Sequence, residues 1–347
     1  MAKFDRDDQP LQNLKAAIRQ GEPARLYIFH GEEAFLLHHY FDRLREAVVE
    51  ELTQEFNYHD FHSENFSMRD FAEAVEGLPL MAQRTMIRVD DVDIFRLPEE
   101  ERTKLAQVLA DIPDYCTVVL TFETVPWKPD KRQKKLWESL SGGEIVEFAR
   151  QSQRDLVSWI TRHFRAKGKT ISPELCGYLV EITDGTMTSI SGEIEKIAAY
   201  SGADTIVRAD IDAVTEPVPD AVVYRMTDFL AAGDYAQALL LLQQLLRMQE
   251  EPLGILGYIG SQFRRISTAR VLLDHGRGSQ ELMKLCGCPD FVARKTMDMA
   301  RRLRPEFCAA AAGLVMETDM KIKTSADDPQ RLLELMLLLL AQEARRV

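Results

Sequence analysis

Residues 116–122 read Cys-Thr-Val-Val-Leu-Thr-Phe, and this nearly continuous apolar run constrains the fold more than any other segment. A strand is apolar along its whole length when both faces of its sheet are covered. Sheets covered in this way are typically parallel, because the helices that connect parallel strands lie on the two faces. The run therefore predicts a buried strand of a parallel sheet.

Strand and helix signals alternate along the first 150 residues. Helical spacing of apolar residues follows the first strand signal, and further helical segments separate the later ones. This alternation predicts an α/β domain, with helices on both faces of the sheet. The other strands are expected at 26–29, 56–61, 85–89 and 144–148, and the helices at 33–51, from the N-cap Ser67 onward, and at 98–110.

Strand signals stop after Phe148, and the remaining pattern is helical. Turn signals at 142–143 and 217–219 mark two boundaries. Within the helical part, helices are expected at 155–167, 173–183, 189–200 and from 221 onward. The sequence thus predicts three domains, which are an α/β domain at 1–148, a small helical domain at 149–215 and a larger helical domain at 216–347.

The charge of the chain is acidic and unevenly distributed. The 347 residues have a formal net charge of −12, and residues 1–150 alone hold 19 basic and 29 acidic side chains. A protein that coats DNA by itself needs concentrated positive charge, so the composition argues against that class. Residues 214–347 have no net charge, and this part could present a local basic face.

Cysteine usage and hydropathy favour a cytoplasmic protein. The five cysteines are scattered, and Cys286-Gly287-Cys288 has no partner pair at the spacing of a zinc site. Reduced thiols are typical of the cytosol. Residues 1–8 lack the apolar segment of a signal peptide, and the run at 335–341 is too short to span a bilayer. We expect no metal and no membrane contact.

An α/β domain followed by a small helical domain suggests a nucleotide-hydrolysing motor. The phosphate loop, G-x-x-x-x-G-K-[ST], should follow the first strand. The segment at 30–36 instead reads His-Gly-Glu-Glu-Ala-Phe-Leu, which lacks the second glycine and the lysine, and its two glutamates would repel a triphosphate. Gly168-Lys169-Thr170 resembles the end of the motif, but it follows a helix and has His163 where the first glycine belongs.

Other candidate chemistry is weak. Asp90-Asp91 resembles a Mg²⁺-binding Walker B pair, but Arg88 interrupts the preceding strand, and a solvated acidic loop is the favoured interpretation. His59 and His62 are three residues apart, but their segment is predicted as strand and loop and not as one helix face, and His38-His39 has no partner at the spacing of a metal ligand. We expect a nucleotidase-like fold without its nucleotide site, with no catalytic residue, no cofactor and no metal.

Two surface features admit alternatives. Gly77-Leu78-Pro79-Leu80-Met81-Ala82 places three large apolar residues in a loop, either as an exposed binding knob or as a staple that packs a helix end onto the sheet. Basic residues on the C-terminal helices, and Lys128–Lys135 in the first domain, indicate solvated helix surfaces. Contact with phosphate backbones is the alternative for the C-terminal set. That set comprises Arg264, Arg265, Arg270, Arg294, Lys295, Arg301, Arg302, Arg304, Lys321 and Lys323.

Four motifs, in this order and spacing, resemble the delta subunit of the bacterial DNA polymerase III holoenzyme, a clamp-loader family. The segment 26–33 resembles its first strand and degenerate phosphate loop, and 78–84 resembles its clamp-contacting segment. Glu193-Ile194-Glu195-Lys196-Ile197 resembles a motif of its lid domain. Residues 319–329 and the following leucine-rich helix resemble the end of its collar domain.

The resemblance implies a degenerate AAA+-like module, a helical lid and an all-α collar. It implies that Leu80 and Met81 contact the sliding clamp (beta), the second of these where the family typically has phenylalanine. It also implies a hetero-pentamer with gamma/tau and delta prime subunits, contact with primed DNA through that complex, and a location in the cytoplasm at replication forks of the nucleoid. The subunit would open the clamp ring and have no catalysis of its own within the polymerase holoenzyme, a nucleotidyltransferase.

Two other functions remain open at this point. The first alternative is an active AAA+-type ATPase with a divergent phosphate site. Titration with Mg-ATP distinguishes it from a clamp-loader subunit that does not bind ATP. A helical scaffold unrelated to replication is the second, and a pull-down with the sliding clamp tests it.

Overall fold

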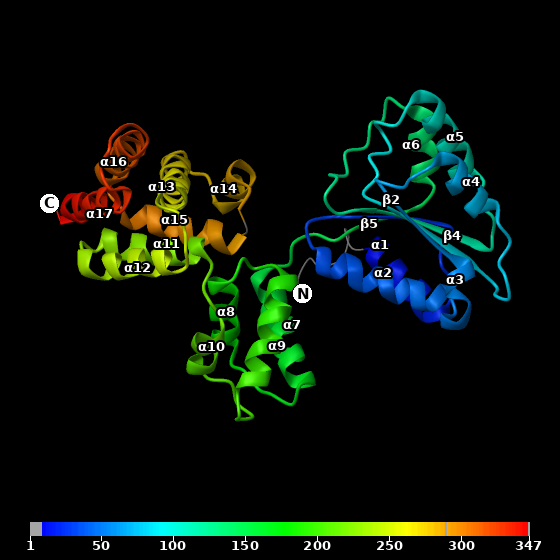
Figure 1. Cartoon of the computed structure of the whole chain (residues 1–347), viewed down its shortest axis with the longest axis horizontal. Coiled ribbons are helices and arrows are strands. Elements are labelled where there is room, and N and C mark those ends of the chain that lie inside the picture. The colour runs from blue at the N-terminus through cyan, green and yellow to red at the C-terminus, as the bar shows by residue number, and fades with distance from the viewer. Residues whose placement is uncertain (1–8, 289, 346–347) are drawn as a thin grey trace. The chain divides into compact units, whose positions relative to one another are not determined.

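The structure, a computed structural model, describes residues 9–288 and 290–345 (Figure 1). The chain divides between Arg150 and Gln151 into two compact units. Residues 1–8, for which the sequence predicts no signal segment, lie outside the described residues. Across the described ranges, no helix is both long and apolar enough to cross a membrane.

The first unit contains a five-stranded parallel sheet with the strand order β2-β3-β4-β1-β5. β4 lies at its centre and all seven of its residues are buried, which confirms the strand predicted from the apolar run at 116–122. The bounds of the strands are β1 (Leu26–His30), β2 (Tyr58–His62), β3 (Thr85–Asp90), β4 (Cys116–Phe122) and β5 (Glu144–Glu147).

Helices cover both faces of this sheet, as predicted (Figure 1). Ile28, Val118 and Leu120 point to one face, where they pack against α4, α5 and α6. Phe29 and Val119 point to the opposite face and pack against α1 and α2. The bounds of these helices are α1 (Gln9–Gln20), α2 (Ala34–Val48), α4 (Met68–Glu76), α5 (Glu99–Ala110) and α6 (Lys134–Ser141).

Three sequence assignments in this unit are wrong in detail. The helix expected to reach residue 51 ends at Val48, and a 3₁₀ turn η1 (Glu51–Thr53) and a short helix α3 (Gln54–Asn57) precede β2. The strand expected at 56–61 therefore begins only at Tyr58, because Phe56 and Asn57 belong to α3. Lys128–Lys135 is not a helix surface throughout, because α6 begins only at Lys134. The Asp130 carboxylate accepts a hydrogen bond from the backbone N–H of Arg132, a local turn that competes with helix formation.

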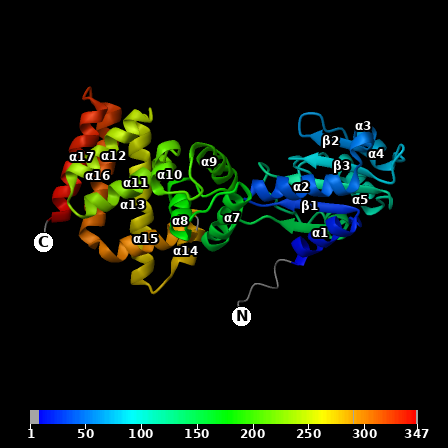
Figure 2. The same cartoon turned by 90° about the horizontal axis from the view of Figure 1, so that it is seen from below.

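Every named element of the second unit is a helix in the described residues. α11–α17 share one apolar core that runs from Val222 to Ala341, and α16 and α17 lie side by side in it (Figure 2). The bounds are α7 (Gln153–Ala166), α8 (Pro173–Ile182), α9 (Met187–Tyr200), α10 (Arg208–Val214), α11 (Pro219–Ala231), α12 (Tyr235–Arg247), α13 (Pro252–Asp274), α14 (Ser279–Cys286), α15 (Asp290–Arg302), α16 (Pro305–Thr324) and α17 (Pro329–Arg345).

Candidate functional site

The loop between α4 and β3 exposes large apolar side chains. α4 starts at the predicted N-cap Ser67, whose hydroxyl accepts a hydrogen bond from the Asp70 N–H, and ends at Glu76. Beyond it, Leu78 is 79% exposed, Leu80 51% and Met81 87%. Exposure of this size contradicts a staple that packs the helix end onto the sheet. Of the two interpretations of this segment, the structure agrees with the exposed knob.

The middle of this loop is fastened to the domain by Asn57. The Asn57 side chain is fully buried at the end of α3. Its Oδ1 accepts a hydrogen bond from the backbone N–H of Leu80 at 2.8 Å, and its Nδ2 donates to the carbonyl oxygen of Leu80 at 2.9 Å. The same Nδ2 donates to the carbonyl of Thr53 at 3.0 Å. The sequence signals did not single out Asn57, because nothing local reveals a partner 23 residues away.

Another exposed apolar side chain lies beside the loop. Phe56 of α3 is exposed. Phe56 and Leu78 line one hollow of about 350 Å³, which Thr85 of β3 also lines. The apolar surface of the loop therefore continues onto the segment that carries Asn57.

The position of a phosphate loop, directly after β1, is filled by the protein itself. Gly31 has a φ of +134°, and a Cβ atom there would lie 2.3 Å from the carbonyl oxygen of Phe148. That same oxygen accepts a hydrogen bond from the backbone N–H of Glu33 at 2.9 Å. A backbone N–H that would face a phosphate in a phosphate loop thus binds the chain that follows β5.

His30 does not provide the missing positive charge at this position. Its ring stacks on the Trp127 indole, with 5.8 Å between the ring centroids. Burial lowers the pKa of His30 below its ordinary value, so the imidazole is neutral at neutral pH. The buried side chain of Glu33 adds a carboxylate at the start of α2, where an anionic ligand would otherwise be stabilised.

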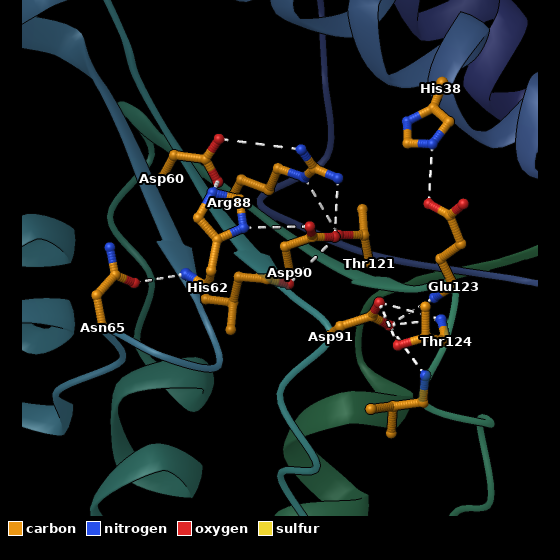
Figure 3. A network of polar contacts seen from close by, with 12 residues as sticks. His38, Asp60, His62, Asn65, Arg88, Asp90, Asp91, Thr121, Glu123 and Thr124 are labelled. Carbon is orange, nitrogen blue, oxygen red and sulfur yellow. Dashed lines mark hydrogen bonds and ion pairs between the residues drawn. The ribbon is translucent and has the colours of Figure 1, made fainter.

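Asp90, at the end of β3, belongs to an ion-pair network rather than to a solvated loop (Figure 3). Nη2 of Arg88 donates to Oδ1 of Asp90 at 2.8 Å, and Nη1 lies 3.9 Å from Oδ2 of Asp60 on β2. The Thr121 hydroxyl also donates to Oδ1 of Asp90, and Nδ1 of His62 lies 3.2 Å from its Oδ2. The carboxylate that resembles a Walker B residue is therefore already bonded to neighbouring side chains.

Asp91 has a different structural role. Its carboxylate accepts hydrogen bonds from the backbone N–H groups of Glu123, Thr124 and Val125, which follow β4 (Figure 3). Burial by itself raises the pKa of Asp91, but these hydrogen bonds outweigh it and hold the pKa below its ordinary value. The interpretation of Asp90-Asp91 as a solvated acidic loop is wrong, because both carboxylates bind protein groups.

Lys169, from the second segment that resembles a phosphate motif, is also structural. Its Nζ donates to the carbonyl oxygens of Ser201 and Ala203 at 2.9 and 2.8 Å. These bonds fasten the turn after α7 to the end of α9. The lysine is thus held by the protein backbone within its own unit.

Most basic residues noted on the C-terminal helices are ion-paired within the unit. Arg265 lies 2.8 Å from a carboxylate oxygen of Asp220, and Lys295 lies 2.7 Å from one of Glu181. Pairs of the same kind involve Arg270, Arg294, Arg301, Arg302, Lys321 and Lys323. Arg304 donates to the carbonyl oxygen of Glu343 instead. These residues therefore lie on solvated helix faces, where neighbouring acidic groups compensate most of their charge.

The arrangement of the titratable side chains also bears on the chemistry of the chain. In the ranges 9–288 and 290–345, no group of three or more His, Cys, Asp or Glu side chains is placed to hold a metal ion. The five cysteines are free thiols, and burial raises the pKa of Cys116 to about 11, which keeps that thiol protonated.

Comparisons with known proteins agree across the length of the chain. The family model described as DNA polymerase III, delta subunit matches residues 27–147, and the model of the DNA polymerase III delta subunit, C-terminal domain matches residues 220–340. Together they match more than two thirds of the chain.

Full-length relatives give the same result. DNA polymerase III subunit delta of Bacillus subtilis is 24% identical over 93% of this chain and 94% of its own length. A probable DNA polymerase III subunit delta of Aquifex aeolicus is 22% identical over 76% of this chain and 75% of its own. The solved structure of the Bacillus subtilis DNA clamp loader delta protein superimposes with a TM-score of 0.68 at 24% identity, and it covers 96% of this chain and 99% of that one.

Proposed function

The chain belongs to the family of DNA polymerase III delta subunits, and from that premise we propose that it binds the sliding clamp through Leu80 and Met81 and opens the clamp ring. The proposal rests on one observation above all, that both side chains are exposed on a loop whose backbone is hydrogen bonded to a buried side chain. Apolar side chains presented in this way fit an apolar pocket on a partner.

Ring opening follows from binding under this proposal. A clamp has closed and open states, and a ligand that binds the open state more tightly shifts the population toward it. Leu80 and Met81 would supply that differential binding free energy. No hydrolysis at this subunit is then required to open the ring, and hydrolysis would belong to neighbouring subunits.

We also propose that the chain does not bind ATP. Mg-ATP titrated into the pure chain in a calorimeter should give no saturable heat. The reason is that Gly31 and the Glu33 N–H pack against Phe148, while Glu33 places a carboxylate at the start of α2.

A divergent but active ATPase predicts the opposite result. Measurable Mg-ATP turnover that is abolished by Asp90→Asn would contradict our proposal and support that alternative. Thermal unfolding of the same variant is the necessary control, because Asp90 also bonds to Arg88 and Thr121 and its loss affects folding.

We propose that residues 216–347 form the collar, through which the chain joins gamma/tau and delta prime subunits in a hetero-pentamer. Large apolar side chains remain exposed on these helices, in addition to those in the shared core. They are Leu240, Leu253, Val271, Leu285, Met316, Met320, Leu335 and Leu338. Residues 1–148 and 149–215 would form the AAA+-like and lid domains, and primed DNA would be contacted through the assembled complex in the cytoplasm, at replication forks.

A chain that ends at Thr215 tests the role of the last seven helices. It should retain clamp binding, because Leu80 and Met81 lie in the first unit, and it should no longer co-purify with the other loader subunits. Co-purification equal to that of the full chain would show that the assembly surface lies elsewhere. Circular dichroism of the shortened chain verifies that the remaining helices are folded.

A further inference from the structure

Asn57 joins two segments that are separate in sequence but meet at the exposed loop. It is the last residue of α3, and its fully buried side chain reaches the backbone of Leu80, 23 residues away. We propose that Asn57 is a positioning residue for the clamp contact, because its amide holds Leu80 and Met81 in the exposed conformation that binds. This inference rests on the proposed function of the loop.

The geometry of the contact gives Asn57 control over the loop. A primary amide carries one acceptor oxygen and two N–H donors. Here the oxygen accepts from the Leu80 N–H, one donor binds the Leu80 carbonyl, and the other binds the Thr53 carbonyl. The amide therefore pairs with Leu80 as a neighbouring strand would, while its third bond fixes it to the start of its own helical segment.

The rest of the loop has little else to hold it. Among the described residues, no backbone N–H between 78 and 84 other than that of Leu80 donates a hydrogen bond. At the end of the loop, the Arg84 side chain reaches the carbonyl of Asp114. The centre, where Leu80 and Met81 lie, thus depends on one buried side chain for its backbone hydrogen bonds.

The conformation of Met81 increases this dependence. Met81 has a φ of +54°, in the left-handed region that residues with a Cβ atom rarely adopt. Such a conformation persists only when the surroundings hold it. The anchored neighbour, Leu80, provides that support, and the Met81 side chain is then directed into solvent, where a partner can reach it.

Loss of the anchor should therefore weaken binding through the population of the competent loop. If the loop samples other conformations, the apparent clamp affinity falls by the fraction of time it spends in the right one. The two hydrogen bonds to Leu80, at ordinary net strength, correspond to about a 5- to 150-fold rise in Kd for Asn57→Ala. The Leu80 and Met81 side chains are unchanged in this variant, so the loss reports their positioning.

The decisive measurement is a double-mutant cycle on the full chain with the sliding clamp. Asn57→Ala is combined with the double substitution Leu80→Ala and Met81→Ala. If Asn57 acts through this loop, its effect on Kd disappears in the double-alanine background. An effect of the same size in both backgrounds overturns the proposal, as does wild-type affinity of Asn57→Ala alone. If the double-alanine chain binds the clamp with wild-type affinity, Leu80 and Met81 do not contact the clamp. Asn57 then cannot position them for that contact, and both proposals are wrong.

Asn65, which is exposed, offers a control for the loss of an asparagine side chain elsewhere in the same unit. Its Oδ1 also accepts a backbone N–H, that of His62 at 2.7 Å, within the same unit but away from the loop. Asn65→Ala should leave clamp affinity unchanged. The thermal midpoint of each variant separates loop positioning from general destabilisation, and measurements are made at a temperature where every variant is folded.

Hydrogen exchange tests the anchor without any substitution. In the free, unmodified chain the Leu80 amide should exchange more slowly than those of Met81 and Ala82, because only the Leu80 N–H among the three has a hydrogen-bond partner. The Asn57→Asp variant, which keeps the acceptor and the size but loses the donors, should show partial loss of this protection together with weaker clamp binding. Equal, fast exchange at Leu80 in the unmodified chain overturns the proposal even if Asn57→Ala fails to fold.

Discussion

Clamp binding by the variant with both Leu80→Asp and Met81→Asp should be weaker by about two to four orders of magnitude. Burial of each side chain in an apolar pocket is worth about 1.5–3 kcal/mol, so the pair contributes roughly 3–6 kcal/mol. At about 1.4 kcal/mol per tenfold change in Kd, the loss corresponds to that range. Leu80 is already half-buried in the free chain, so it has less surface left to bury on binding. We therefore expect its contribution to the binding free energy to lie near the lower end of that range.

The same variant should keep its thermal midpoint. Met81 is 87% exposed and Leu80 is about half-exposed, so aspartate at either position has access to water. Unchanged clamp binding would show that the loop does not contact the clamp. A large fall in the thermal midpoint would show that the two side chains pack within the domain. Leu285→Asp is a matched control, because Leu285 is an exposed apolar residue of the other unit and its change should leave clamp affinity intact.

The fold of the first unit could be predicted because its signals are local. The strand at 116–122 is apolar along its whole length, and in the structure it is the central strand, buried on both faces. Pro98 precedes its helix because the proline ring fixes φ at a value that suits a helix start. Ser67 precedes its helix because its hydroxyl caps the first turn. Patterns within ten residues were sufficient for these elements.

The site was predictable only in part, for the opposite reason. The apolar loop around Pro79 leaves a knob and a staple open, and Leu80 and Met81 are implied by the family resemblance. Asn57, whose side chain is hydrogen bonded to Leu80, precedes the loop by more than twenty residues. In the sequence, Arg88 only interrupts the apolar pattern of a strand that resembles a Walker B strand. Its role becomes visible when the parallel register places Asp60 directly beside it.

Arg88→Ala should destabilise the first unit by about 3–5 kcal/mol, the range expected when one partner of a buried ion pair is removed. The Arg88 side chain is 13% exposed, and the guanidinium contacts carboxylates of Asp60 and Asp90. Its removal leaves the partly buried carboxylates of Asp60 and Asp90 without their guanidinium partner and beside the His62 imidazole. It also removes a cation from the face of the Phe41 ring, where the guanidinium carbon lies 4.7 Å from the ring centroid.

Thermal unfolding measures this effect, and a loss of that size lowers the midpoint of a unit of about 150 residues by about 10 °C. Arg69→Ala is the matched control, because the Arg69–Glu73 pair is exposed on α4 and such pairs contribute little to stability. A midpoint for Arg88→Ala as high as that of the control would contradict the structural role of the network. If the role is correct, the residue that interrupts the apolar pattern of β3 is the one that allows the Asp60 and Asp90 carboxylates to lie close together on two adjacent strands.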